Sequence, residues 1–155
     1  MATQPVRVYA DTSVFGGAFD EEFHEASRAF LADVRAGRLR LVTSPLVEEE
    51  IAAAPAKVRR LFSETLVVAE VAVVDENALR LRDAYLHRGV VGPRWAADAL
   101  HVALATVSGA SVVVSWNFAH IVHFDKIAMY NAVNAEQGHG VIAIHSPREV
   151  IAYED

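Results

Sequence analysis

Three acidic residues of this chain lie in or next to apolar stretches of the sequence, where a charged side chain is not expected merely to keep the surface soluble. Asp11 directly follows an apolar run, Glu50 falls on the apolar side of a predicted helix, and Asp98 lies inside an alanine-rich, apolar helical segment. An ionised carboxylate in apolar surroundings is unfavourable unless it is paired or bound to a metal. Carboxylate oxygens are the ligands that hard divalent cations such as Mg²⁺ and Mn²⁺ prefer. The three acids therefore predict a site for such a cation.

Helical geometry separates Glu50 from the two glutamates before it. At about 100° per residue, the apolar residues of the segment 46–51 define one face, and Glu50 falls inside it while Glu48 and Glu49 fall outside. Each of the three acids also has a plainer interpretation. Asp11 could cap a helix or turn, Glu50 could be a helix-edge residue with a solvated head, and Asp98 could only complement the helix dipole.

Polar residues beside these acids are candidate supporting groups. Thr12 and Ser13 directly follow Asp11 and could orient its carboxylate. Asn117 follows a later apolar run, where a fourth polar ligand is expected. Its amide oxygen could coordinate a cation or orient a bound water but adds no negative charge, and asparagine is also a common turn residue.

The histidines near this pattern do not predict a transition-metal site. His101 lies one turn after Asp98 and is interpreted as a core histidine with satisfied hydrogen bonds. A zinc site at His120 and His123 is a weak alternative, because two histidines without a third ligand at helical spacing often occur by chance. The chain has no cysteine, which excludes disulfides and thiolate metal sites and is typical of a reducing cytoplasm.

The elements that must position these residues alternate between strand and helix patterns. This alternation predicts an α/β fold with a mainly parallel sheet of about five strands. The predicted strands are 6–10, 39–43, about 67–74, 111–115 and about 140–145. The predicted helices are 22–36, 45–53, 56–64, 76–88, 94–108, 125–135 and 147–152. Ligands of such sheets bind beyond the carboxyl ends of the strands, where strand order reverses.

Length, composition and net charge limit the classes of protein to which this chain can belong. The 155 residues predict a single domain over 1–155, and 53% hydrophobic with 22% charged residues is typical of a globular chain. No apolar run reaches signal-peptide or membrane-spanning length, so we expect no membrane partner. The net charge of −6 argues against a tight nonspecific nucleic-acid coat. We find no phosphate-binding glycine loop, dinucleotide motif or nucleophile elbow.

Several short motifs, in order, resemble those of the PIN-domain family, which includes the VapC-like toxins of toxin–antitoxin pairs. They cover nearly the whole chain and comprise Val8-Tyr9-Ala10-Asp11-Thr12-Ser13, Thr43-Ser44-Pro45-Leu46-Val47 with Glu50-Ile51, Ala97-Asp98-Ala99-Leu100-His101-Val102-Ala103, Val114-Ser115-Trp116-Asn117-Phe118 with His120-Ile121, and Ile144-His145-Ser146-Pro147-Arg148-Glu149.

The resemblance implies a parallel sheet between helical layers, Mg²⁺- or Mn²⁺-dependent cleavage of RNA, frequent homodimerisation and inhibition by a small antitoxin protein. Asp11, Glu50 and Asp98 match the family's acidic ligands, and Thr12 and Ser13 match supporting hydroxyls. Asn117 stands where many members carry a further aspartate, which leaves one fewer charge for a second metal or for activity.

The leading hypothesis is a cytoplasmic, metal-dependent endoribonuclease that acts as the toxin of a toxin–antitoxin pair. The catalytic set is predicted as Asp11, Glu50, Asp98 and Asn117. The alternative is a catalytically weak or inactive PIN-fold binding module regulated by a protein partner, which the asparagine motivates; a phosphatase or DNA nuclease is a third interpretation. The basic residues predicted to follow the RNA are Arg59, Arg60, Arg88 and Arg94.

Overall fold

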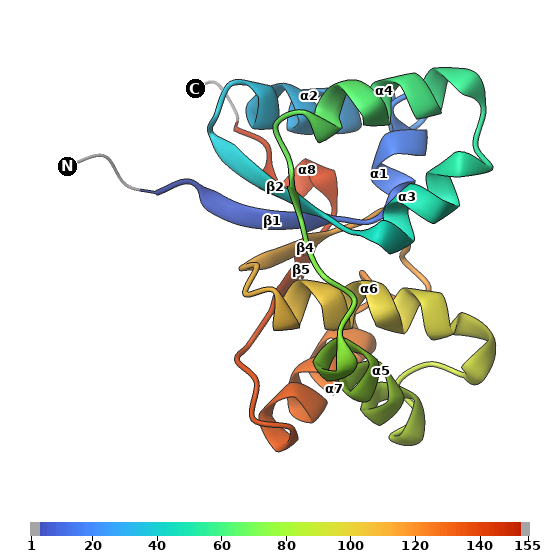
Figure 1. Ribbon diagram of the computed structural model, residues 1–155, viewed down its shortest axis with the longest axis vertical. Helices are drawn as coiled ribbons and strands as arrows, with labels where there is room; N and C mark the ends of the chain where they lie inside the picture. Colours follow the sequence, from blue (N-terminus) through green and yellow to red (C-terminus); the bar gives the residue numbers. More distant parts are fainter. Residues whose placement is uncertain (1–3, 153–155) are drawn as a thin grey trace.

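A five-stranded, all-parallel sheet crosses the middle of the molecule in the computed structural model, which describes residues 4–152 (Figure 1). The strand order is β3-β2-β1-β4-β5. The strands are β1 (Val6–Ala10), β2 (Leu39–Thr43), β3 (Glu70–Val71), β4 (Val112–Val114) and β5 (Ala143–His145). The predicted α/β class with a mainly parallel sheet is confirmed.

Helices cover both faces of this sheet and complete the predicted three layers (Figure 1). The first layer contains α1 (Thr12–Gly17), α2 (His24–Arg35), α3 (Pro45–Ala52), α4 (Ala56–Leu66) and α8 (Pro147–Val150). The second contains α5 (Glu76–His87), α6 (Ala96–Val107), α7 (Phe124–Glu136) and the single 3₁₀ turn η1 (Pro93–Trp95). No helix among residues 4–152 is both long and apolar enough to cross a bilayer.

Local sequence signals explain where these helices begin and end. Ser44 caps α3 by accepting the backbone N–H of Val47 at 3.3 Å, and proline follows at the first helical position. Ser146 caps α8 through a capping box with Glu149. Gly37 adopts φ +80° just after α2, in the left-handed region that glycine reaches without strain.

Two parts of the fold differ from the sequence prediction. The strand predicted at about 67–74 shrinks to Glu70–Val71, because Val67 still caps the end of α4 and both Val67 and Val73 are largely exposed, at 85% and 73%. The helix α1 was not predicted. It forms because Asp11 caps its first turn and because Val14 and Phe15 are fully buried.

The order of the strands defines where the functional edge lies. The chain leaves the central strand β1 toward β2 on one side and later returns to β4 on its other side. The strand order therefore reverses between β1 and β4, and their carboxyl ends form the crevice in which open α/β sheets bind ligands. Asp11, the first residue beyond β1, donates its backbone N–H to the Val114 carbonyl of β4 at 3.2 Å.

Candidate active site

Asp11 stands at the reversal point with its carboxylate held on both oxygens. Ser13 donates to Oδ1 through its backbone N–H at 3.1 Å and its hydroxyl at 2.5 Å. Ser115, the first residue after β4, donates its hydroxyl to Oδ2 at 2.6 Å. The Ser13 hydroxyl in turn accepts the backbone N–H of Trp116 at 2.9 Å. The turn after β1 and the turn after β4 are thus joined around a single carboxylate.

Burial sets the electrostatic character of Asp11, which is only 4% exposed. Desolvation raises the pKa of the Asp11 carboxyl, and the nearby Asp98 carboxylate raises it further. The charge of His101 and the hydroxyls of Ser115 and Ser13 oppose this shift without cancelling it. Asp11 is therefore a buried acid with too little positive charge around it, which is the situation that a bound cation relieves.

Glu50 hydrogen-bonds the buried His101, although its own side chain is 37% exposed. His101 Nε2 lies 2.5 Å from Glu50 Oε1, and the Thr12 hydroxyl donates to the same oxygen at 3.0 Å. Partial burial by itself raises the pKa of Glu50, but these two partners outweigh it and hold the pKa below its ordinary value. Glu50 is ionised at neutral pH.

A buried hydrogen-bonded chain stands behind Glu50. Because an ionised carboxylate can only accept, His101 donates from Nε2 to Glu50, and on the other side of the ring a hydrogen bond of 2.8 Å joins Nδ1 to the Tyr9 hydroxyl. The Tyr9 and Ser44 hydroxyls are hydrogen-bonded to each other at 2.8 Å, and the Ser44 oxygen accepts the Val47 N–H. His101 is thus both the satisfied core histidine predicted from the sequence and a fixed support for a site residue.

Asp98 lies in the first turn of α6 and is half-buried, with 21% of its side chain exposed. Its Oδ2 lies 3.3 Å from His120 Nδ1, and the Asn117 side chain hydrogen-bonds the same carboxyl group. Burial raises the pKa of Asp98, the histidines 120 and 101 and Asn117 oppose the shift, and Glu50 adds to it. Asn117 also accepts the His120 backbone N–H at 3.0 Å, so it acts as a turn residue and as a partner of Asp98.

The three predicted acids share one electrostatic environment. Asp98 raises the pKa of Asp11, and Glu50 raises the pKa of Asp98, so Asp98 interacts electrostatically with both of the other acids. In residues 4–152, however, no three acidic or histidine side chains stand close enough together to hold one ion as they are. Glu50 turns toward His101, and Asp98 turns toward His120. Carboxylate oxygens are chemically suited to a hard cation, but the Glu50 and Asp98 carboxylates face histidines rather than a common centre.

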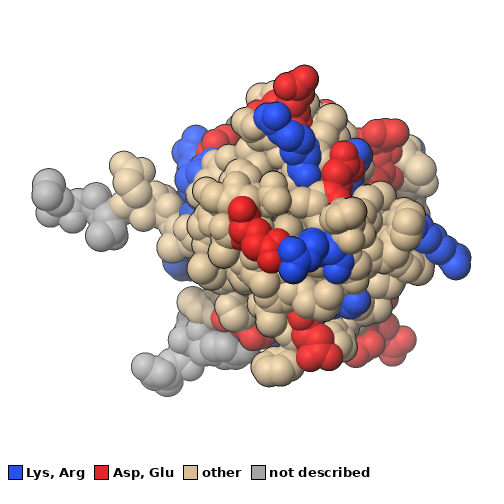
Figure 2. Space-filling model, turned by 90° about the horizontal axis from the view of Figure 1, so that it is seen from below, with Lys and Arg blue, Asp and Glu red and all other residues tan. Residues whose placement is uncertain are grey.

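The predicted basic residues do not form one track. Arg59 and Arg60 lie on α4 and Arg88 follows α5, and Figure 1 places these helices on opposite sides of the sheet. Arg88 pairs with Glu136 at 2.6 Å, and Figure 2 shows basic and acidic side chains interspersed on the face that it displays. Arg94 is linked to one acid through two ring contacts, because its guanidinium lies over Trp95, which stacks on His120, the partner of Asp98.

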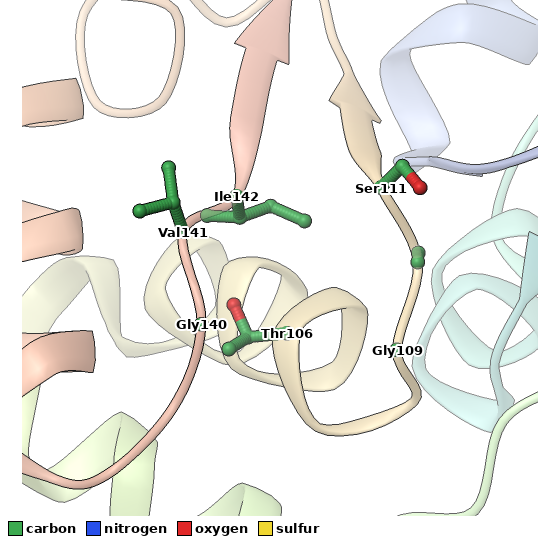
Figure 3. Close-up of a pocket in the computed structure, with 7 residues that line it drawn as sticks. Thr106, Gly109, Ser111, Gly140, Val141 and Ile142 are labelled. Atoms are coloured by element: carbon green, nitrogen blue, oxygen red, sulfur yellow. The ribbon is translucent and has the colours of Figure 1, made fainter.

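One cavity elsewhere in the molecule is a poor candidate for chemistry. It measures about 340 Å³ and lies at the amino ends of β4 and β5, so it is at the opposite end of the sheet from Asp11 (Figure 3). Its lining contains no acidic, basic or histidine side chain: Thr106, Gly109, Ala110, Ser111, Gly140, Val141 and Ile142. The carboxyl edge of the sheet remains the candidate active site.

Sequence reasoning missed several residues of this edge. Tyr9, Ser44 and Ser115 support the acids, and His120 contacts Asp98, but none of the four was predicted to do so. Ser115 could have been found, because it directly follows a strand at the predicted reversal point. The other contacts join segments far apart in the chain and carry no local signal.

Comparison with known proteins identifies relatives of this fold. The family model of the PIN domain matches residues 8–128. No curated protein sequence matches the chain. Among solved structures, the chain is similar to a chain in the crystal structure of VapBC2 from Rickettsia felis, which is bound to a DNA fragment from the VapBC2 promoter. The TM-score is 0.53 and the identity 12%, over 91% of this chain and 98% of the other.

Proposed function

Because this chain belongs to the PIN-domain family, we propose that it is a metal-dependent endoribonuclease. PIN domains are generally nucleases, and the acids of this chain occupy the edge where an α/β sheet presents its site. The observation that carries the proposal is Asp11, a buried carboxylate at the strand reversal whose pKa is raised by burial and by the carboxylate of Asp98 on α6. A bound cation would stabilise the ionised form of such a group.

The carboxylates of Asp11, Glu50 and Asp98 would hold Mg²⁺ or Mn²⁺. A bound ion of this kind lowers the pKa of a coordinated water and offsets charge on the phosphate that the water attacks. The chain's own residues prepare the ligands. Ser13 and Ser115 orient Asp11, while His101 and Thr12 both bond Oε1 of Glu50, so that among the described residues none bonds Oε2.

The test of this function is RNA cleavage by the purified protein in Mg²⁺, in Mn²⁺ and in EDTA. We expect cleavage in either metal and none in EDTA. Asp98→Asn keeps the size of the side chain and one acceptor oxygen but removes its charge, so turnover should fall about 10²-fold or more. Undiminished turnover by this variant would remove Asp98 from the site. No cleavage by the wild-type protein in either metal would reject the nuclease.

We propose the same protein as the toxin of a toxin–antitoxin pair, with a small antitoxin as partner, a homodimer as its assembly and the cytoplasm as its compartment. The similar fold of a chain from VapBC2 supports this role. A neighbouring gene for a small protein with a DNA-binding end would support it further, because such a protein would be the candidate antitoxin.

The second candidate function is a PIN-fold binding module with little or no catalysis. Asn117 favours it, because an amide replaces a charge and its oxygen already accepts the His120 backbone N–H. Calorimetry with Mn²⁺ separates the two functions. An enzyme should bind the metal through Asp11 and Glu50, so replacing either should reduce the heat of binding. A module should bind no Mn²⁺ in a way that depends on these acids.

The chain behind Glu50 makes a separate prediction about metal affinity. His101→Leu removes the donor that fixes the carboxylate, so we expect Mn²⁺ to bind about 10- to 100-fold more weakly, as for other supports of metal ligands. Tyr9→Phe is the matched control, because it removes the hydrogen-bond partner on the other side of the His101 ring and leaves the His101–Glu50 contact in place. It should lower the affinity less. Equal Mn²⁺ affinity for His101→Leu and the wild-type protein would contradict a positioning role.

A further inference from the structure

An exposed tryptophan is attached to the acidic site through a stacked histidine. Trp95, in η1 directly before α6, is 37% exposed, and its ring lies 4.1 Å from that of His120 at an interplanar angle of 25°. His120 in turn contacts Asp98 at 3.3 Å. The indole is therefore two contacts away from a proposed metal ligand, in the turn that leads into the same helix.

A cation accompanies this ring. The guanidinium of Arg94 lies over Trp95 with 4.9 Å between its central carbon and the ring centroid. Arg94 is exposed, and no acidic partner is recorded for it among the described residues. An aromatic face with an adjoining arginine is the combination that proteins use to hold an unpaired base together with its phosphate.

A second set of aromatic residues, Trp116 and Phe118, flanks Asn117 in the segment that follows β4. Phe118 is 46% exposed and lies edge-on to Trp116, which stacks on Phe23 at 4.1 Å. The segment 115–120 therefore runs from a partner of Asp11, past Asn117, to a partner of Asp98, and it carries aromatic rings at both sides of the amide. An exposed aromatic ring, that of Phe118, thus lies in the same segment as the partners of two acids.

Because the chain carries a net negative charge, a polyanionic substrate needs contacts other than phosphate attraction, and the aromatic rings can provide them. The chain carries 20 acidic and 14 basic residues, and the helices that carry the arginines predicted to contact RNA lie on opposite sides of the sheet. Attraction to phosphates alone is then weak. Stacking of bases on aromatic rings is independent of net charge and tolerant of sequence, so it can supply the affinity that basic residues do not.

We propose that Trp95, backed by His120, is a stacking platform for an unpaired nucleobase of the strand whose phosphate lies at the acids. Arg94 then leaves the indole face and contacts a phosphate of that strand. This inference rests on the proposed nuclease function and narrows its substrate to RNA with at least one unpaired base beside the cut. Duplex RNA, whose bases are already stacked, cannot use the platform.

Tryptophan fluorescence tests the platform without catalysis. The chain has two tryptophans, Trp95 at 37% exposure and Trp116 at 6%, so a ligand at the surface quenches mainly Trp95. The probe is a short single-stranded 2′-O-methyl oligouridine, added in EDTA at low salt. We expect saturable quenching by this strand and none by the same length of abasic strand or by a duplex. Equal quenching by abasic strand, or no binding of the oligouridine, would overturn the proposal.

Variants separate stacking from general attraction, with binding measured by anisotropy of a labelled oligouridine. Trp95→Leu should weaken binding about fivefold or more, and Trp95→Tyr, which keeps a flat ring, should bind within about twofold of the wild-type protein. Phe124→Leu is the control, because Phe124 is 88% exposed and has no recorded ring contact within residues 4–152. Melting curves establish that each variant is folded.

The outcomes distinguish this inference from the function on which it rests. If the wild-type protein cleaves RNA in Mn²⁺ while Trp95→Leu binds the oligouridine normally, the platform is wrong and the nuclease stands. If Trp95→Leu instead changes only the oligomeric state measured by light scattering, the ring belongs to a protein contact, which also overturns the proposal. Absence of cleavage by the wild-type protein rejects the nuclease directly.

Discussion

Asp11→Asn should abolish RNA cleavage and, at the same time, make the metal-free protein more stable. Asparagine preserves the cap of α1, because its amide oxygen can still accept from Ser13, and its amide group can donate to Ser115. It removes the charge that would bind the cation. We expect turnover in Mn²⁺ to fall about 10³-fold, the upper end of what one electrostatic group in a buried site contributes.

The gain in stability follows from the direction of the pKa shift. Burial raises the pKa of Asp11 in the folded protein above that of the unfolded chain. Folding then favours the protonated acid, so the metal-free protein loses stability as pH rises from the ordinary pKa of aspartate to the raised one. The pKa of Asp98 is also raised, so its ionisation lowers stability in the same way, whereas the pKa of Glu50 is lowered, so its ionisation favours the folded state. Asparagine cannot ionise, so this variant avoids Asp11's share of the loss.

Melting temperatures measured from acidic to neutral pH, with EDTA or with Mn²⁺, test both halves of this prediction. In EDTA at neutral pH the variant should be more stable by about 0.5–2 kcal/mol, the usual gain from relieving a functional site. In Mn²⁺ the wild-type protein should gain stability by binding the ion and the variant should not. A variant that cleaves RNA normally, or that is less stable than the wild-type protein in EDTA, would contradict the role given to Asp11.

The backbone elements that bury both of their faces were the most predictable from sequence. The bounds predicted for the first two strands, 6–10 and 39–43, are those of β1 and β2. These strands are central, so burial imposes a clear apolar pattern on them. The edge strand β3 carries no such constraint. The apolar residues around it remain exposed, and their pattern was wrongly extended over eight positions.

The acids of the candidate site could be selected from the sequence because each one conflicts with its local surroundings. Glu50 interrupts the apolar side of a helix, and Asp98 interrupts an apolar helix near its start. Their supports were not predictable in the same way. His101 is 92 residues from Tyr9 in the chain, and only the packing of α6 against the sheet brings their rings together. A periodic pattern gives the face of one helix but not the partner that the face meets.

The two adjacent glycines of α1 should respond to alanine with opposite signs. An added Cβ at Gly17 would lie 2.6 Å from Trp116 Nε1 and 2.8 Å from Ser27 Oγ, the two atoms that form a buried hydrogen bond at 2.8 Å. The Trp116 ring cannot yield easily, because it is stacked against Phe23. We expect overpacking and a weakened buried bond to cost Gly17→Ala about 2–4 kcal/mol.

Gly16→Ala is the matched control for this substitution. Gly16 is exposed in the same helix, and nothing lies within 4 Å of an added Cβ. Alanine there restricts the unfolded chain without strain, so it should stabilise the protein by about 0.5–1 kcal/mol. Chemical denaturation of both variants gives the two free energies of unfolding. Equal effects at the two positions would mean that the close approach of α1 to Trp116 does not exist.

The same pair of variants links the fold to the site. Trp116 donates its backbone N–H to the Ser13 hydroxyl that bonds Asp11, so a displaced Trp116 disturbs the carboxylate itself. Gly17→Ala should therefore weaken Mn²⁺ binding as well as stability, whereas Gly16→Ala should leave the metal affinity unchanged. Calorimetry at a temperature where both variants remain folded measures this. If Gly17→Ala lowered stability but bound Mn²⁺ like the wild-type protein, the tryptophan would support the core alone and not the acid.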